Sequence, residues 1–438
     1  MFAYYVDLAW RSLRRSRGLT ILMVLAIGFG VAASMTTFAV FRAASGDPIP
    51  WKSGKLFVPQ IDSAGPGNGN TDNEPPQQLT YPDAMALMRD HRAVHQSAMY
   101  RLGVSVVPDK AGAHPFNVDG HAVFAGFFPM LDVPFAYGSA WSHADDQHRA
   151  AVVVISSHLN DKLFGGGNSV GRSINIEGKN YRVVGVTDHW DPKPMFYDVV
   201  NTGGFTTQRD DVLIPLPSAI DANITNQGTT NCSRPSPEPG FVGLQHSTCV
   251  WIAYMAELDS TAQVSAYKRY LDNYARSQQQ AGRYDWPPNN RLRSLPQWLD
   301  YMHVVPSDTK VSLLVALGLF VVCLVNTAGL LLAKLTRRSG EIGVRRAIGA
   351  PRRAIYAQFV IEAGMVGLTG GVLGMVLTAL GVLAMRVVLP PEIADLARLN
   401  VGLFALTVLV AMAATVLAGL YPSFRAANVQ PAWHLKSH

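Results

Sequence analysis

The sequence predicts a membrane protein with four transmembrane α-helices and a large α+β extracytoplasmic domain inserted between helices 1 and 2. Three observations point to this fold class: long apolar runs, basic residues gathered in alternate loops, and mixed helix and strand periodicity in the longest loop. Only 16% of the residues are charged, a composition that already disfavours an ordinary soluble protein.

Four apolar runs are long enough to cross a bilayer, at residues 19–41, 311–333, 354–385 and 399–421. Each exceeds the roughly 20 residues that a helix needs to span a hydrocarbon core of about 30 Å. Only the third run carries a charge well inside its ends, at Glu362. A cleaved signal peptide is the alternative for the first run, but its apolar stretch is longer than the roughly 7–15 residues of such a segment. We therefore expect the first run to remain as a membrane helix.

Basic residues set the expected orientation, because short translocated loops avoid Lys and Arg. Residues 1–18 hold four arginines against one acid, Asp7, and residues 334–353 hold seven basic residues against one acid, Glu341. We expect both segments in the cytoplasm, which places the inserted domain and the short loop around Pro390 outside. The basic balance of the chain belongs largely to these membrane-flanking segments, so nucleic acid is not expected as a partner.

The segment boundaries follow from the runs and the loop charges. Residues 2–17 place apolar and basic side chains on opposite faces of a helix, which predicts an interfacial helix before the first crossing. We predict a cytoplasmic interfacial helix (1–18), transmembrane helix 1 (19–41), an extracytoplasmic core domain (42–310), transmembrane helix 2 (311–333), a cytoplasmic coupling linker (334–353), transmembrane helix 3 (354–385), a short extracytoplasmic loop (386–398), transmembrane helix 4 (399–421) and a cytoplasmic tail (422–438).

The inserted domain mixes both periodicities. Residues 45–78 are dense in Gly, Pro, Asn and Asp, so we expect an extended linker there and a folded domain that begins near Tyr81. A helix capped by Ser307 or Asp308 is expected to run without a break into the second membrane helix. The expected elements of the domain are helices at 81–95 and 261–280, strands at 103–107, 151–155 and 250–257, and a hairpin at 173–186.

The three cysteines divide between two environments. Cys232 and Cys249 lie in the inserted domain, where an oxidising compartment would allow a disulfide between them. Two free thiols in a poorly ordered loop are the alternative. Cys323 falls in the middle of a membrane run and is interpreted as a small packing residue.

Motifs for catalysis or metal binding are weak. Residues 166–173 read G-x-x-x-x-G-R-S, close to a nucleotide-binding P-loop, but a predicted strand follows where a helix is required. His91 and His95 stand four residues apart on a predicted helix, and a second polar cluster contains His143, Asp145, Asp146 and His148. A solvated surface explains both groups as well as a metal does. We therefore expect no catalytic, cofactor-binding or metal site, as in a non-catalytic membrane subunit.

Two features of the third apolar run bear on its packing. Its small residues are spaced so that a neighbouring backbone can approach closely, at Gly367, Gly370, Gly371 and Gly374. We expect a tight helix pair there, within the chain or across a dimer. Glu362 is expected to face protein and the basic cytoplasmic side, because a carboxylate in lipid is costly; a role in moving protons or substrate is the alternative.

The linker and third run read GEIGVRRAIGAPRRAIYAQFVIEA and GMVGLTGGVLG, and the end of the fourth run reads LAGLYPSFRAANVQPAWHL. These segments resemble the MacB/FtsX family of ABC transporter permeases. In the inserted domain, the segments that resemble the family's MacB-like periplasmic core domain read AVVVIS, LFGGGNSVGRSINIEGKNYRVVGV and VLIPL. Few residues precede the first run, so the resemblance implies that the ATPase, fused in the namesake, is here a separate chain.

The resemblance implies a permease of the bacterial cytoplasmic (inner) membrane that works with cytoplasmic ABC ATPase subunits and a second permease, identical or related. ATP and Mg would be bound by the ATPase, and no cofactor by this chain. The linker would dock on the ATPase as a coupling helix through Glu341, Ile342, Arg345, Arg346, Ile348, Gly349 and Ala350. A periplasmic adaptor and an outer-membrane channel are further partners that the resemblance leaves open.

The resemblance favours export of a hydrophobic compound, a peptide or a lipid-linked cargo, driven by ATP hydrolysis through motion of the extracytoplasmic domain. The alternative is an FtsX-like mechanotransmitter that regulates an extracytoplasmic enzyme or sensor without moving cargo. An extracytoplasmic enzyme on a membrane anchor is disfavoured, because four crossings exceed what an anchor needs and no catalytic motif accompanies them.

Overall fold

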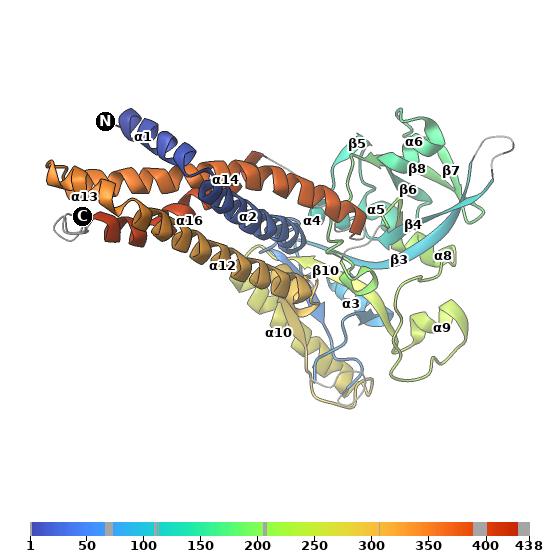
Figure 1. Cartoon of the computed structure of the whole chain (residues 1–438). Helices are drawn as coiled ribbons and strands as arrows, with labels where there is room; N and C mark the ends of the chain where they lie inside the picture. The colour runs from blue at the N-terminus through green and yellow to red at the C-terminus, as the bar shows by residue number, and fades with distance from the viewer. Residues whose placement is uncertain are drawn as a thin grey trace. The chain divides into compact units, whose positions relative to one another are not determined.

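The computed structural model of the chain describes residues 2–65, 73–108, 112, 114–204, 208–305, 307–388 and 401–427. The chain divides into two compact units, each described by itself. We call the first the membrane unit, formed by Met1–Gly46 and Val305–His438, and the second the inserted domain, formed by Asp47–Val304. Figure 1 traces both units along the chain.

The membrane unit consists of helices, as the apolar runs predict. Within the described residues, four helices are long and apolar enough to cross a bilayer, with candidate spans at Arg17–Arg42, Lys310–Arg337, Arg352–Ala384 and Val401–Phe424. The predicted number of crossings is therefore confirmed. The helices of this unit are α1 (Phe2–Arg15), α2 (Arg17–Ser45), α12 (Ser307–Arg337), α13 (Ser339–Ala347), α14 (Arg352–Val388) and α16 (Val401–Ala427).

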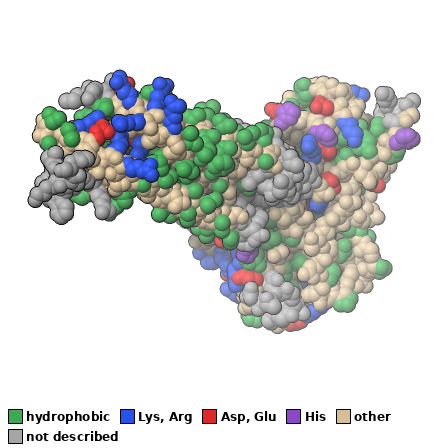
Figure 2. Space-filling view, in the orientation of Figure 1, with side chains coloured by type: hydrophobic (Ala, Val, Ile, Leu, Met, Phe, Trp, Pro, Cys, Tyr) green, Lys and Arg blue, Asp and Glu red, His purple; other side chains and the backbone are tan. Residues whose placement is uncertain are grey.

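Helix α14 is the central element of the membrane unit, because it packs against α2, α16 and α1, while α12 packs against α2 and α16. Hydrophobic side chains cover the visible surface of the long helices, and Lys and Arg side chains gather near α1 at the end where α13 also lies (Figure 2). This is the distribution that a bilayer requires of a helix bundle. Most of the predicted loop at 386–398, and the tail beyond residue 427, lie outside the described residues.

The inserted domain is built on a mixed sheet with the strand order β11-β1-β10-β3-β4-β9-β6-β8-β5. Strands β4 and β9 pair in parallel, as do β6 and β8, whereas the other neighbours along this path are antiparallel. The strands are β1 (Leu56–Gln60), β2 (Leu79–Thr80), β3 (His95–Val107), β4 (Phe116–Val123), β5 (Phe135–Gly138), β6 (Val152–Ser156), β7 (Ser173–Ile176), β8 (Lys179–Thr187), β9 (Val212–Pro215), β10 (Val250–Glu257) and β11 (Arg291–Ser294).

Both faces of the sheet are covered, because successive side chains of a strand point to opposite faces. On β10, Ile252 and Tyr254 join one apolar cluster, while Ala253 and Met255 join a second. The helices of the domain are α3 (Tyr81–Asp90), α4 (Phe127–Leu131), α5 (His143–Gln147), α6 (Ser157–Phe164), α7 (Val199–Thr202), α8 (Leu216–Asp221), α9 (Gly240–His246), α10 (Thr261–Gln280) and α11 (Leu295–Tyr301). The α+β class is confirmed.

Two local predictions for the inserted domain are wrong. The segment expected to be a linker contains β1, whose five residues are all buried between β10 and β11. The Gly and Pro residues that suggested a linker lie on both sides of this strand. The helix expected at 81–95 ends at Asp90, because His91 adopts a left-handed conformation as its cap, and His95 already begins β3. His91 and His95 therefore do not share a helix face.

Candidate functional site

A buried charged cluster lies at the end of the membrane unit that carries α1 and α13. Glu362 of α14 is 2% exposed and forms an ion pair with Lys334 of α12, which is 4% exposed. The hydroxyl of Ser12 on α1 donates a hydrogen bond to Glu362 Oε1 at 2.8 Å. The guanidinium of Arg338 lies 3.8 Å from the other carboxylate oxygen. One carboxylate therefore has partners on α1 and α12 and at the residue that precedes α13.

A second carboxylate extends this cluster along α13. Glu341 accepts a hydrogen bond from Arg345 at 2.9 Å and pairs with Arg338 at 3.2 Å. The guanidinium of Arg15 on α1 lies 4.0 Å from Glu341. Because such partly exposed pairs contribute little singly, their effect comes from joining several helices in one network. We call Ser12, Lys334, Arg338, Glu341, Arg345 and Glu362 the charged cluster.

Apolar packing fixes α13 on its inner side. Ile342 is 5% exposed and forms a small buried group with Leu335, Ile355 and Phe359. On the outer side Ile348 is 82% exposed, which is unusual for a large apolar side chain. Gly349 then turns the chain toward α14 with a φ of +105°, a conformation that L side chains rarely adopt. A short amphipathic helix thus presents an apolar side chain at a tight turn.

The residues predicted from the sequence to dock on the ATPase divide into those with partners in the chain itself and those that are at least partly accessible. Ile342 is buried against the chain itself, and Glu341 and Arg345 are engaged in the charged cluster. Arg346 and Ala350 are half-buried, whereas Ile348 and Gly349 are exposed. Only some of the residues predicted to dock on the ATPase are therefore accessible on and beside α13. Val344, which was not among them, is accessible as well, at 53% exposure.

The glycines of α14 lie against two different helices. A Cβ added at Gly367 would meet Met412 Cα at 2.9 Å and Ala411 O at 3.0 Å, and one at Gly371 would also meet α16. A Cβ at Gly370 would instead meet Ile27 of α2 at 2.8 Å, and Gly374 also faces α2. The tight helix packing expected from these glycines thus lies within one chain, on both sides of α14.

The chain that carries the charged cluster matches two protein families. Residues 20–274 match the model of the MacB-like periplasmic core domain, and residues 313–431 match that of the FtsX-like permease C-terminal domain. Together the two matches cover most of the chain. The protein belongs to the MacB/FtsX family of ABC transporter permeases.

Curated relatives of this MacB/FtsX permease are named as export proteins. A pyoverdine export ATP-binding/permease protein, PvdT, of Pseudomonas syringae pv. tomato is 26% identical over 99% of the chain. A macrolide export ATP-binding/permease protein, MacB, of Escherichia coli is 25% identical over 97% of the chain. The chain spans 59% of the length of each relative. The solved periplasmic region of MacB from Actinobacillus actinomycetemcomitans aligns over 59% of the chain, with 12% identity and a TM-score of 0.37.

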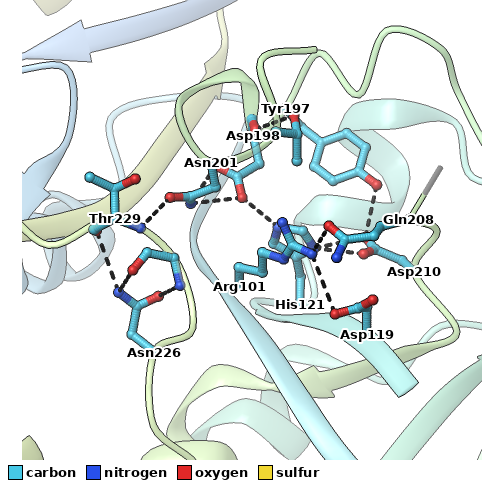
Figure 3. A network of polar contacts seen from close by, with 12 residues as sticks. Arg101, Asp119, His121, Tyr197, Asp198, Asn201, Gln208, Asp210, Asn226 and Thr229 are labelled. Atoms are coloured by element: carbon cyan, nitrogen blue, oxygen red, sulfur yellow. Dashed lines mark hydrogen bonds and ion pairs between the residues drawn. The ribbon is translucent and has the colours of Figure 1, made fainter. Parts of the chain in front are cut away.

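The inserted domain of the permease contains a polar network that the sequence reasoning missed. His121 of β4 lies between two carboxylates: Nδ1 donates to Asp210 at 2.8 Å and Nε2 donates to Asp198 at 2.8 Å (Figure 3). Tyr197 donates a further hydrogen bond to Asp210. Burial lowers the pKa of His121, but the charges and hydrogen bonds of Asp210 and Asp198 outweigh it and raise the pKa to about 10.

This network ties the segment between β8 and β9 to β4. The side-chain amide of Asn201 donates to Asp198, and Asn201 Oδ1 accepts a hydrogen bond from the backbone N–H of Thr229 (Figure 3). The network joins the segment 197–210 to His121, 77 positions from Asp198, and to Thr229, 28 positions from Asn201. No local spacing in the sequence marks these distant partners as a group. Their polar atoms are hydrogen-bonded to one another, so the network holds these segments of the domain together.

The other residues that the sequence singled out lie in a disulfide, in a turn and at a helix cap. Cys232 and Cys249 are joined by a disulfide. Of the P-loop-like residues, 166–172 lie between α6 and β7, and Ser173 begins β7. His143 and Asp145 lie on α5, where Asp145 forms a capping box with Ser142. Within the part of the chain that the structure describes, no three His, Cys, Asp or Glu side chains gather as a metal site would require.

Proposed function

We propose that this chain is the permease subunit of an ABC transporter in which an ATPase subunit binds α13 and drives motion of the inserted domain. The charged cluster supports the proposal most directly, because it joins α13 to Lys334 on α12. Helix α12 then continues from Arg337 to Ser307 without a break, at the boundary of the inserted domain. A displacement imposed on α13 would therefore reach the domain through a single rigid helix.

The proposed orientation places α1 and α13 in the cytoplasm of a bacterium, where an ATPase can bind ATP and Mg. Basic residues at this end of the membrane unit support that orientation. The cargo that we propose is a hydrophobic compound, a peptide or a lipid-linked molecule, in keeping with relatives named for pyoverdine and macrolide export. A second permease copy or paralogue would complete the transporter.

Copurification tests the docking step. The tagged full chain is purified in mild detergent, and mass spectrometry determines whether an ABC ATPase accompanies it. Ile348→Asp places a charge on the highly exposed apolar side chain that caps the C-terminus of α13 and should abolish copurification. Val242→Asp, on the inserted domain at 51% exposure, is the matched control and should leave it unchanged. Undiminished ATPase recovery with Ile348→Asp would exclude this surface as the docking site.

A second measurement separates export from mechanotransmission. Deletion of the gene should raise the cellular accumulation of pyoverdine-like or macrolide-like compounds if the chain supports export. If accumulation is unchanged and an envelope hydrolase loses activity instead, the FtsX-like role replaces the export role. Both outcomes leave the family assignment and the docking surface intact.

A further inference from the structure

The inserted domain contains a cavity of about 670 Å³ that the proposed coupling role does not use. Ligand pockets in proteins commonly measure about 300–1,000 Å³ and combine apolar walls with a few placed polar groups. Helices α3, α5 and α8 and the residues beside them line this cavity. We call it the α3–α5–α8 pocket.

The floor of the α3–α5–α8 pocket is apolar and adaptable. Its side chains are half-buried and pack against the main core of the domain, and they are Tyr81, Met85, Met88, Phe124 and Ile220. Methionine has an unbranched, polarizable side chain that fits ligands of irregular shape. Tyr81 is held in place by stacking on Trp251, with ring centroids 5.9 Å apart. The floor therefore suits a flexible apolar group.

The rim of the pocket carries basic and imidazole side chains. Arg89 and Arg149 are exposed there, with 78% and 57% of their side-chain surfaces accessible. His91 and His143 meet edge to face at 6.2 Å between ring centroids, so the two polar clusters noted in the sequence converge at this rim. Arg149 is also oriented by an ion pair with Asp221. Several donors thus surround the pocket mouth.

The one carboxylate among the residues that line the pocket is already engaged. Asp146 is 5% exposed, and its two oxygens accept hydrogen bonds from the backbone N–H of Ala125 and from Trp141 Nε1, both at 2.8 Å. Burial, which outweighs these hydrogen bonds, raises the pKa of Asp146 to about 6. Asp146 therefore anchors α5 and does not offer a site for a cationic ligand.

From this arrangement we infer that the α3–α5–α8 pocket binds an amphiphile with a single anionic head group. The apolar chain lies on the methionine and aromatic floor, and the head group accepts hydrogen bonds from Arg89 and Arg149. Charge-assisted hydrogen bonds to guanidinium groups suit a carboxylate or a phosphate. The inference stands whether the chain exports cargo or transmits force, because it concerns the inserted domain alone.

Photo-crosslinking with dodecanoate that carries a diazirine tests the inference on the full chain in nanodiscs of zwitterionic lipid. Mass spectrometry then maps the adducts. We expect adducts in the peptides that contain Met85, Met88 and Ile220. Dodecanol with the same diazirine, which lacks the charge, should label them about tenfold less, the loss expected from a hydrogen bond to a charged group. Equal labelling by both probes would overturn the anionic specificity.

Substitutions in the pocket provide a second test of the inference. Arg89→Gln with Arg149→Gln removes the rim charge at exposed positions and should reduce dodecanoate labelling about tenfold. Met85→Trp fills the floor and should abolish labelling, while Val242→Trp, an exposed position outside the pocket, should leave it unchanged. If Met85→Trp fails to fold, the labelling of the Arg89→Gln/Arg149→Gln variant decides whether the pocket is the binding site. Adducts confined to the membrane helices would exclude the pocket as a site.

The source of the anion is resolved by repeating the labelling in nanodiscs that contain phosphatidylglycerol. Protection of the pocket peptides by this lipid would identify the bilayer as the source. Undiminished labelling would identify a soluble amphiphile. Each result keeps the pocket assigned to an anionic amphiphile, which only the probe and variant comparisons can overturn.

Discussion

His121 shows how much a single side chain contributes to the inserted domain. His121→Gln would leave Asp198 and Asp210 buried without the positive charge that they share. Removing one partner of a buried ion pair commonly costs about 3–5 kcal/mol, and we expect a loss of this size in the free energy of unfolding. Urea unfolding of the full chain in detergent, followed by tryptophan fluorescence, measures it, with Trp190 stacked on Tyr197 as a nearby reporter.

A matched substitution controls for the loss of an imidazole. His158 also pairs with a carboxylate, Asp211, at 3.1 Å, but 53% of its side-chain surface is exposed. His158→Gln should therefore change the free energy of unfolding by less than about 1 kcal/mol. Equal effects of the two substitutions would contradict the importance of burial at His121.

The pH dependence of stability follows from the same histidine. Its pKa is raised from 6.5 to about 10 on folding, so the proton that it binds stabilises the folded state. This stabilisation is fully present below pH 6.5, decreases as the pH rises from there, and is lost beyond about 10. Between those values the free energy of unfolding should decrease by about 1.4 kcal/mol per pH unit more in the wild type than in His121→Gln. Parallel pH profiles would disprove the shift.

Among the elements, α14 depends most on small residues. Gly367→Ala would bring a Cβ within 2.9 Å of Met412 Cα and 3.0 Å of Ala411 O, neither of which can move without shifting the backbone of α16. We expect destabilisation of about 1–3 kcal/mol, as for other overpacked interiors. Gly364→Ala, one turn earlier, would meet only Val416 Cγ2 at 3.8 Å and should be tolerated. Thermal unfolding in nanodiscs compares the two variants.

The ion pair between α12 and α14 calls for a double-mutant cycle. Glu362→Gln leaves Lys334 buried and unneutralised, and we expect a stability loss of about 3–5 kcal/mol and a lower yield of folded protein. Adding Lys334→Met should recover much of that loss, because both charges are then absent. Wild-type yield of Glu362→Gln with abolished transport would instead give Glu362 a direct role in transport.

Sequence patterns predicted elements best where one physical cause dominates. Apolar length predicted the four crossings, and periodicity predicted β10 and α10 at their observed bounds. Contacts between residues far apart in the sequence were not predicted. Strand β1 was missed because its residues are followed by a loop rich in Gly and Pro, and the cluster around His121 was missed because its members meet only after the sheet forms. The packing of Ile342 against α14 likewise depends on tertiary structure.

At the scale of the whole molecule, the proposed topology predicts that the region of α13 and the inserted domain are labelled from opposite sides of the membrane. Ile348→Cys at the C-cap of α13 and Ser277→Cys on α10 both introduce an exposed thiol. In intact cells a membrane-impermeant maleimide should label Ser277→Cys and leave Ile348→Cys unlabelled until the membrane is permeabilised. The native Cys232–Cys249 disulfide contributes no free thiol to this background. Labelling of Ile348→Cys in intact cells would reverse the orientation.

The pairing of Lys334 with Glu362 also bears on how the chain enters the membrane. A charged side chain costs up to about 2.5–3.5 kcal/mol when a translocon inserts it at the centre of a helix, and less toward the helix ends. Helix α12 precedes α14 in the chain, so Lys334 is synthesised before Glu362. Lys334 on the earlier helix then provides a counter-charge for Glu362 on the later helix, in surroundings where little water is present to solvate the carboxylate. We therefore expect the ion pair to lower the cost of holding both charges in the membrane, so that α12 favours the insertion of α14.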